Sequence, residues 1–248
     1  MNSDMLAGKT AIVTGAGRGL GEAIAAGLTA AGAAVAAMSR TDAADALVQR
    51  GDAEVAIRAD LADRAALRAG FDRAIGALGG RIDILVNCAG IQRRHECEDF
   101  PIDDWDEVLE VNLTATFELC QLAGRAMLAR GRGKIINIAS MLSFFGGIRV
   151  PAYAASKGGV MQLTRALANA WGGRGVQVNA LAPGYMTTEM NAALLADAER
   201  SASILARIPA GRWGEPGDIV GPCLFLASDL SDYVNGAIIP VDGGYLSF

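Results

Sequence analysis

The strongest constraint on the fold is a regular alternation between short apolar runs and longer stretches with helical spacing. The apolar runs have the length of buried strands, about four to eight residues. They are residues 10–15, 33–38, 53–58, 82–87, 133–140, 176–183 and 236–241. Because strands that are apolar throughout are typical of parallel sheets covered on both faces, the runs predict such a sheet.

The stretches between these runs are expected to form helices on both faces of the sheet, with right-handed crossovers. The prediction is an α/β fold in a single domain over residues 1–248, with a doubly wound parallel sheet of about seven strands. Residues 184–210 interrupt the alternation, and we expect this partly helical insertion to cover a site at the strand ends. The stretches with helical spacing are residues 19–31, 63–77, 103–129, 153–171 and 215–227.

Composition excludes several classes of function. The net charge of −5 argues against a nucleic-acid partner, because such binding needs a basic face. The uncharged stretch 23–39 is shorter than the roughly 20 apolar residues that span a bilayer, and we interpret it as a helix, a glycine and a buried strand. The start of the chain shows no signal-peptide pattern. These two observations lead us to expect no membrane association. The four cysteines have no CxxC spacing, so we also expect no zinc site. Reduced thiols are typical of a cytoplasmic protein, which is the location we expect.

A glycine-rich loop follows the first expected strand. In "TGAGRGLG" (14–21), Gly15 permits a tight turn, Gly19 lets the backbone approach a pyrophosphate, and Gly21 allows helix and strand to pack closely. The helix that begins there adds N–H donors and a positive dipole end. The loop predicts dinucleotide binding, and an ordinary glycine-rich turn is the alternative.

Two more strand ends fit the same ligand. Asp60 follows the third expected strand and could accept a hydrogen bond from an adenine amino group. It could also be the N-cap of a helix over residues 61–77, and both roles are compatible. "NCAG" (87–90) follows the fourth expected strand, where small residues would let a ribose and a nicotinamide lie against the backbone.

A tyrosine and a lysine are four residues apart in "YAASK" (153–157). Residues at this spacing lie on one helix face, with Cβ atoms about 5–6 Å apart. A nearby ammonium lowers the pKa of a phenol, which makes Tyr153 a plausible general acid/base beside Lys157. Ser140 ends the fifth expected strand and could hold a substrate oxygen at the same edge of the sheet. An ordinary helix-surface pair is the alternative.

These motifs, in this order, resemble the short-chain dehydrogenase/reductase family. The resemblance extends over nearly the whole chain, and it implies a Rossmann-type fold, an NAD(P) cofactor and a homotetramer. One departure is Cys88, where the family usually has Asn; we expect little loss because Asn87 remains. Further matching stretches are "VNL" (111–113), "IAS" (138–140), "VNALAPG" (178–184) and the segment from "FLASD" to "VDGG" (225–244).

The resemblance implies a role for each catalytic residue. Tyr153 would transfer the substrate proton, and Ser140 would hold the substrate oxygen. Lys157 would bond the nicotinamide ribose and tune the tyrosine. Asn112, on the long fourth helix, would help to hold a water relay to Lys157.

The resemblance also implies contacts with the cofactor. Pro183 and Gly184 would flank the nicotinamide, and Thr188 would contact a phosphate or the carboxamide. The full implied set of cofactor-binding residues is Gly15, Arg18, Gly19, Leu20, Ser39, Arg40, Asp60, Leu61, Asn87, Ala89, Gly90, Tyr153, Lys157, Pro183, Gly184, Met186 and Thr188.

The end of the second expected strand bears on the choice between NADP and NAD. NAD-selective relatives have an acidic residue at about the position of Ser39, where it bonds the ribose 2′-OH. Here Ser39 is followed by Arg40, and Arg18 lies in the glycine loop. Two arginines suit a 2′-phosphate, so NADP is favoured. Asp42 leaves NAD possible.

Three stretches resemble the branch of the family that acts on sugar acids, 2-deoxy-D-gluconate 3-dehydrogenase, also called 2-dehydro-3-deoxy-D-gluconate 5-dehydrogenase. They are residues 89–94, 137–160 and 207–216. The carboxylate of a sugar acid suits a planar guanidinium. Among the nearby arginines, Arg94 is the first candidate for that contact and Arg149 the second; an exposed surface charge is the alternative for each.

Other activities remain open. Within the family, a gluconate 5-dehydrogenase or a 3-oxoacyl carrier-protein reductase would share these motifs, although the latter should carry a basic docking patch that the sequence does not show. A non-catalytic dinucleotide-binding regulator could use the same fold. The presence of both Tyr153 and Lys157 argues against a regulator.

Overall fold

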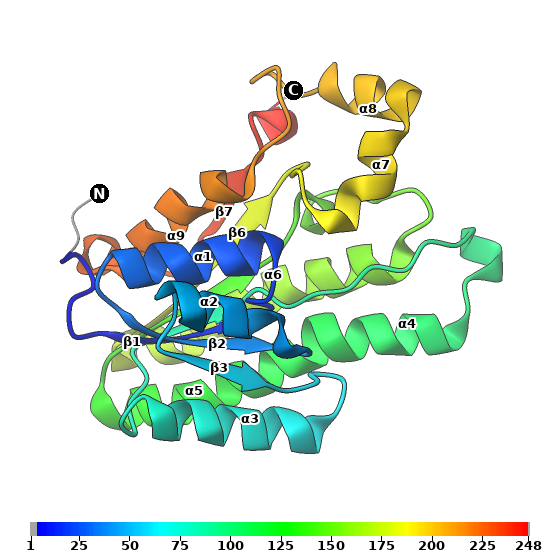
Figure 1. Cartoon of the computed structure of the whole chain (residues 1–248). Helices are drawn as coiled ribbons and strands as arrows, with labels where there is room; N and C mark the ends of the chain where they lie inside the picture. The colour runs from blue at the N-terminus through cyan, green and yellow to red at the C-terminus, as the bar shows by residue number, and fades with distance from the viewer. Residues whose placement is uncertain (1–3, 248) are drawn as a thin grey trace.

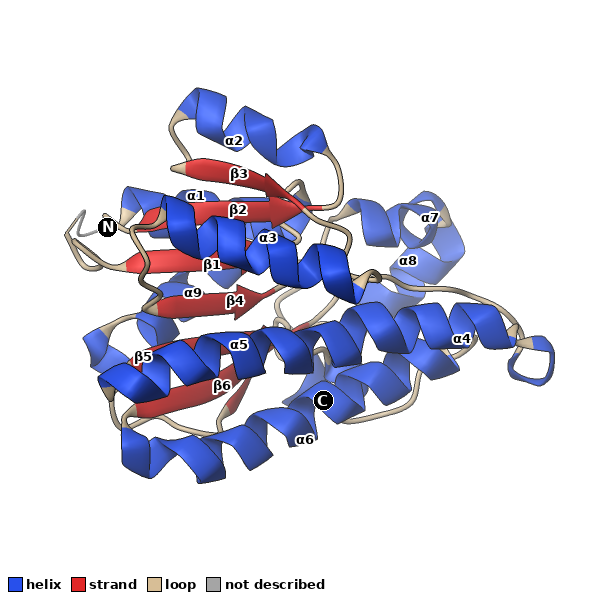
Figure 2. Cartoon of the chain, turned by 90° about the horizontal axis from the view of Figure 1, so that it is seen from below, coloured by secondary structure: helices blue, strands red, loops and turns tan. Residues whose placement is uncertain are grey.

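The computed structural model describes residues 4–247. Within them, seven parallel strands form one sheet in the order β3-β2-β1-β4-β5-β6-β7. Figure 2 shows this order from β3 to β6. The strands are Thr10–Thr14 (β1), Ala34–Ser39 (β2), Val55–Arg58 (β3), Ile84–Asn87 (β4), Gly133–Ile138 (β5), Val176–Pro183 (β6) and Ile238–Val241 (β7). The predicted doubly wound parallel sheet is confirmed.

Helices cover both faces of this sheet (Figure 1). α1 and α9 pack on one face, and α3, α5 and α6 pack on the other. The described helices are Gly19–Ala30 (α1), Asp45–Arg50 (α2), Arg64–Ala77 (α3), Ile102–Leu109 (α4), Ala115–Arg130 (α5), Pro151–Trp171 (α6), Ala192–Ala196 (α7), Ala198–Leu205 (α8) and Val220–Ala227 (α9).

Burial on both faces explains why the strands are apolar throughout. Ile12 of β1 packs with Leu67 of α3, whereas its neighbour Val13 packs with Ile24 of α1. All four side chains are at most 1% exposed. Because successive strand residues point to opposite faces of the sheet, the residues of β1 on both faces must be apolar.

The strand order reverses at β1, which lies between β2 and β4. In an open α/β sheet, a ligand binds in the crevice outside the carboxyl ends of the strands at such a reversal. The loops that follow β1, β2, β4 and β5 all leave the sheet at this edge. The fold therefore places the glycine loop, "NCAG" and Ser140 around one crevice.

Two local features differ from the predicted elements. The expected helix over residues 103–129 is α4 and α5 joined by a π-helical turn, Glu110–Thr114. The short helix α2 was not predicted, because six residues are too few for a helical period to be recognised. The insertion over residues 184–210 contains α7 and α8. No helix within residues 4–247 is long and apolar enough to cross a membrane.

Candidate active site

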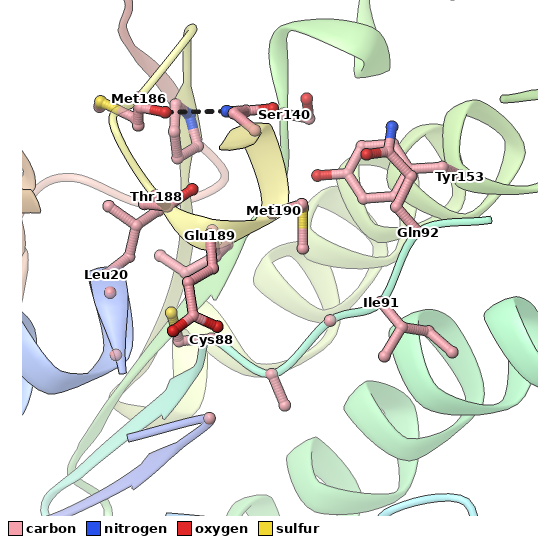
Figure 3. Close-up of a pocket in the computed structure, with 18 of the residues that line it drawn as sticks. Leu20, Cys88, Ile91, Gln92, Ser140, Tyr153, Met186, Thr188, Glu189 and Met190 are labelled. Carbon is pink, nitrogen blue, oxygen red and sulfur yellow. Dashed lines mark hydrogen bonds between the residues drawn. The ribbon is translucent and has the colours of Figure 1, made fainter. Parts of the chain in front are cut away.

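A cavity of about 970 Å³ opens at the carboxyl ends of the strands. Its wall combines the glycine loop, the ends of β2 to β6, the start of α6 and parts of the 184–210 segment. Figure 3 shows the Tyr153 hydroxyl directed into this space. The predicted site residues on the wall are Gly15, Arg18, Gly19, Leu20, Ser39, Arg40, Asp60, Leu61, Ala89, Gly90, Arg94, Ser140, Tyr153, Lys157, Pro183, Gly184, Met186 and Thr188.

The glycine loop brings backbone close to backbone. Gly15 has φ +68°, and a Cβ there would lie 2.8 Å from the Cα of Ala89. A Cβ on Gly21 would overlap the carbonyl oxygen of Gly15. No side chain caps the N-terminus of α1, so its first N–H groups remain available to an anion. This glycine-rich backbone cradle fits the pyrophosphate of a dinucleotide.

Asp60 is on the cavity wall and is not a helix N-cap. The N-cap of α3 is Asp63, whose Oδ1 accepts hydrogen bonds from the N–H groups of Ala65 and Ala66. The exposed Asp60 carboxylate accepts only a local bond from the N–H of Ala62, at 3.0 Å, among the described residues. The capping alternative is therefore wrong, and Asp60 remains open to a ligand.

Two arginines line the part of the cavity where we expect the 2′ group of the adenosine ribose, at the glycine loop and the end of β2. Arg18, in the glycine loop, forms an ion pair with Glu189 of the 184–210 segment. Arg40 is exposed on the cavity wall, and no described residue forms an ion pair with it. Asp42, which left NAD possible, is not part of the wall. The wall at the end of β2 therefore presents the Arg40 guanidinium, which suits a 2′-phosphate.

Ser140, Tyr153 and Lys157 meet at the end of β5 and the start of α6. The Lys157 side chain is 3% exposed, and its Nζ donates a hydrogen bond of 2.6 Å to the carbonyl oxygen of Ile138. This Nζ lies 5.7 Å from the centre of the Tyr153 ring. The Ser140 hydroxyl accepts from the N–H of Leu142 at 3.1 Å, which fixes it at the cavity. The predicted catalytic trio is therefore assembled in space.

The electrostatics of this trio differ from the prediction. Burial raises the pKa of Tyr153 to about 12, although a hydrogen bond with Ser140 acts in the opposite direction. Burial also lowers the pKa of Lys157 to about 8. We expected the lysine to lower the pKa of the tyrosine; this is wrong for the protein alone, because desolvation of the phenol dominates. Tyr153 is therefore protonated at neutral pH, the state of a proton donor.

This pKa leads to a titration experiment on the protein without ligand. Between about pH 6 and pH 10, ultraviolet absorbance of wild type and Tyr153→Phe should show the same tyrosinate signal, because Tyr153 stays protonated over that range. A tyrosinate step below about pH 9 that is present in wild type and missing in the variant would contradict the effect of burial.

Asn112 lies in the π-helical turn and is completely buried. Its Oδ1 accepts from the N–H of Ile91 at 2.8 Å, and its Nδ2 donates to the Ile91 carbonyl at 3.0 Å and to the Ser156 hydroxyl at 3.1 Å. The amide therefore holds the segment after β4 against α6. The predicted role of Asn112 in a water relay to Lys157 stays a prediction, because none of these three bonds tests it.

Asn87 is corrected as a cofactor-binding residue. Its Nδ2 donates to Asn137 Oδ1 at 2.9 Å and lies 3.3 Å from the sulfur of Cys120, in the core. Cys88, not Asn87, is part of the cavity wall. Neighbouring residues at a strand end point to opposite sides, so Asn87 cannot replace the amide that is missing at position 88.

The arginines after β4 have different surroundings. Arg93 donates to Glu107 at 2.7 Å. Arg94 lies on the cavity wall, forms no ion pair with any described residue, and donates only to Gln92 Oε1 at 3.3 Å. Burial lowers the pKa of the Arg94 guanidinium. An unpaired guanidinium in the cavity matches the predicted carboxylate contact.

Arg149 is corrected as the second candidate for that contact. Its Nε lies 3.0 Å from Glu96 Oε1, and it is not part of the cavity wall, although its neighbours Ile148 and Val150 are. Its backbone has φ +66°, in the left-handed region that residues other than glycine rarely adopt.

Sequence reasoning missed several residues of the wall. Arg200 and Arg207 come from the 184–210 segment, and Tyr245 comes from the C-terminal end of the chain. Arg207 places its Cζ 4.4 Å from the centre of the Tyr245 ring, and the rings of Tyr185 and Tyr245 are 5.4 Å apart. The break in the strand–helix alternation at residues 184–210 predicted that this segment covers the site. It did not predict which of its side chains face the cavity.

Comparison with known proteins covers nearly the whole chain. A family model described as enoyl-(acyl carrier protein) reductase matches residues 15–246. A 2-dehydro-3-deoxy-D-gluconate 5-dehydrogenase of Escherichia coli is 49% identical over 246 residues, which cover 98% of this chain and 97% of the relative.

Two crystal structures with bound NADP are also similar. A proposed NAD(P)-dependent gluconate 5-dehydrogenase of Beutenbergia cavernae is 53% identical, with a TM-score of 0.93 and coverage of 99% of this chain and 100% of that one. A proposed 2-deoxy-D-gluconate 3-dehydrogenase of Agrobacterium tumefaciens is 49% identical, with a TM-score of 0.91 and full coverage of both chains. With its predicted catalytic trio gathered at one cavity, this protein belongs to the short-chain dehydrogenase/reductase family.

Proposed function

We propose that this protein is an NADP(H)-dependent oxidoreductase that interconverts a secondary alcohol and a ketone on a sugar acid, such as 2-deoxy-D-gluconate or 2-dehydro-3-deoxy-D-gluconate. The observation that carries the proposal is one cavity that holds both the Ser140–Tyr153–Lys157 trio and the unpaired guanidinium of Arg94. The names of the similar proteins support the same substrate class. Assembly of the complete trio disfavours a non-catalytic regulator.

NADP(H) would bind along the glycine loop and the ends of β2 and β4, and it supplies or accepts a hydride. The protein handles the proton. In ketone reduction, the protonated Tyr153 donates to the substrate oxygen, which the Ser140 hydroxyl orients. The Lys157 ammonium, 5.7 Å from the ring centre, then stabilises the phenolate that remains. Oxidation of the alcohol uses the reverse proton transfer.

The choice of cofactor is tested by Arg40→Ala. The guanidinium is expected to contact the 2′-phosphate of NADP, so its loss should raise KM for NADP by about tenfold or more. KM for NAD should change much less, because NAD lacks this phosphate. Steady-state kinetics with each cofactor measure both values.

Arg165→Ala is the matched control, because Arg165 is exposed on α6 and lies outside the cavity wall. Equal effects of Arg40→Ala on the two cofactors would contradict 2′-phosphate recognition. A wild-type preference for NAD of more than about tenfold would overturn the NADP assignment.

The activity itself is tested with purified protein and a substrate panel. D-Gluconate, 2-deoxy-D-gluconate, 2-dehydro-3-deoxy-D-gluconate and an acetoacetyl thioester are each supplied with both cofactors. We expect the highest kcat/KM with a deoxy or dehydro sugar acid. The highest value with gluconate would favour a gluconate 5-dehydrogenase, and the highest value with the thioester would favour a 3-oxoacyl carrier-protein reductase.

We also propose a cytoplasmic homotetramer in which residues 184–210 cover the substrate. The family resemblance supports this assembly, and so do large apolar side chains that are exposed along α4 and α5, Ile102 and Phe117. Light scattering of the purified protein measures the assembly. A monomer at micromolar concentration would contradict it.

A further inference from the structure

The substrate end of the cavity carries a surplus of positive charge. Arg94, Arg200 and Arg207 line it, and within residues 4–247 none of them forms an ion pair. The acidic side chains on the wall are Glu22, Asp60 and Glu189, and among the described residues none of them pairs with these arginines. Asp60 follows β3, where the adenine is expected. Glu189 pairs with Arg18 and Glu22 pairs with Arg50, both beside the glycine loop.

Arg207 is held in place by the packing around it. The flanking side chains of Ile204 and Ile208 are buried in a small cluster that also contains Tyr245. The Arg207 guanidinium lies over the Tyr245 ring, at 4.4 Å from Cζ to the ring centre. Asp242 accepts hydrogen bonds of 2.9 Å from two N–H groups of the C-terminal turn that carries this tyrosine. The cation therefore has a defined position before any ligand binds.

The three arginines reach the cavity from two segments. Arg94 comes from the chain between β4 and α4, whereas Arg200 and Arg207 come from α8 and the turn after it. Burial lowers the pKa of Arg94, and the charge of Arg200 acts in the same direction. The charges of Arg200 and Arg207 both act to lower the pKa of the half-buried Tyr185 hydroxyl. One substrate carboxylate could neutralise Arg94 and would leave the other two arginines without a counter-charge.

We propose that Arg200 and Arg207 form a second anion position, so that the cavity prefers sugar acids with a carboxylate at both ends over sugar acids with one. This inference rests on the proposed function, because it concerns the same substrate site. The shared chemistry is a second anionic group, at the other end of a substrate whose first carboxylate contacts Arg94. A terminal phosphate is the other source of such a group.

Binding of four matched compounds tests the proposal. D-Glucarate differs from D-gluconate by a carboxylate in place of the terminal hydroxymethyl group, 6-phospho-D-gluconate carries a terminal phosphate, and D-glucitol is uncharged. Calorimetry is carried out with saturating NADPH, which cannot oxidise these alcohols, so that no turnover occurs. We expect glucarate to bind with a Kd about tenfold or more below that of gluconate. We expect glucitol to bind most weakly of these three.

Variants assign the advantage to the two arginines. In Arg200→Gln/Arg207→Gln, the ratio of the gluconate Kd to the glucarate Kd should fall to about one. Arg207→Lys, which retains a charge, should keep part of the advantage, and the exposed control Arg165→Gln should keep all of it. Thermal unfolding shows whether each variant is folded. If the double variant does not fold, the ratio of the two Kd values in Arg207→Lys still tests the role of Arg207.

Three results would overturn the proposal: equal affinity of wild type for glucarate and gluconate, an unchanged ratio in the folded double variant, or tighter binding of 6-phosphogluconate than of glucarate. The last result would assign the position to a phosphate. Failure of the proposed function is distinguishable, because it would appear as absence of turnover of every sugar acid with NADP. The binding ratio is measured without turnover.

Discussion

Tyr153→Phe is expected to lower kcat by at least about 10²–10⁴-fold, the usual effect of losing a general acid–base group. The variant removes only the hydroxyl, which burial keeps protonated with a pKa of about 12. The ring and the position of Lys157 remain, since the lysine is held by the carbonyl oxygen of Ile138. The Kd for NADPH, measured by fluorescence titration, should therefore stay nearly unchanged.

Tyr233→Phe is the matched control, because it makes the same chemical change at a fully exposed ring outside the cavity wall. Its kcat should equal that of wild type. Retention of most of kcat in Tyr153→Phe would remove the proton-transfer role from this residue. A large loss of cofactor affinity would instead indicate that the hydroxyl is needed for binding.

Arg94→Ala is expected to lower kcat/KM for sugar acids by roughly 30- to 1000-fold. A charge-assisted contact with a carboxylate in a partly desolvated site contributes about 2–4 kcal/mol, and each 1.4 kcal/mol corresponds to about tenfold. A small neutral ketone or alcohol should be affected much less, because it has no carboxylate. Steady-state kinetics with both kinds of substrate measure the difference.

The neighbouring Arg93→Ala is the control for this variant. Arg93 already donates to Glu107 and is not on the cavity wall, so its loss should change kcat/KM only slightly. If Arg94→Ala leaves the sugar-acid value within about threefold of wild type, the carboxylate is read elsewhere. Arg200 and Arg207 would then be the remaining cations at that end of the cavity.

Much of the fold was predictable because its signals are local or periodic. Apolar runs of strand length located every strand of the sheet, and β6 has the predicted bounds, Val176–Pro183. Helix–strand alternation then left few topologies, since parallel strands need crossovers of one hand. The π-helical turn Glu110–Thr114 was not predictable, because it keeps the apolar pattern of a continuous helix.

The candidate site was only partly predictable. Glycine spacing and the separation of Tyr153 from Lys157 are chain-level properties, and the structure brings these residues to one cavity. The directions of individual loop side chains, by contrast, cannot be derived from spacing along the chain. Arg93, Arg94 and Arg149 all lie in loops, yet only Arg94 reaches the cavity wall, because Glu107 and Glu96 engage the other two.

The sequence by itself determined the parallel sheet and the glycine loop, because each follows from a period or a spacing along the chain, and the family resemblance predicted the catalytic trio. The tertiary structure alone decided the protonation of Tyr153 and the inward position of Arg207. Both depend on contacts with segments distant in sequence: the phenol loses water inside the cavity, and the guanidinium lies over a tyrosine ring 38 residues further along the chain. Desolvation and packing between distant segments leave no local pattern in a sequence.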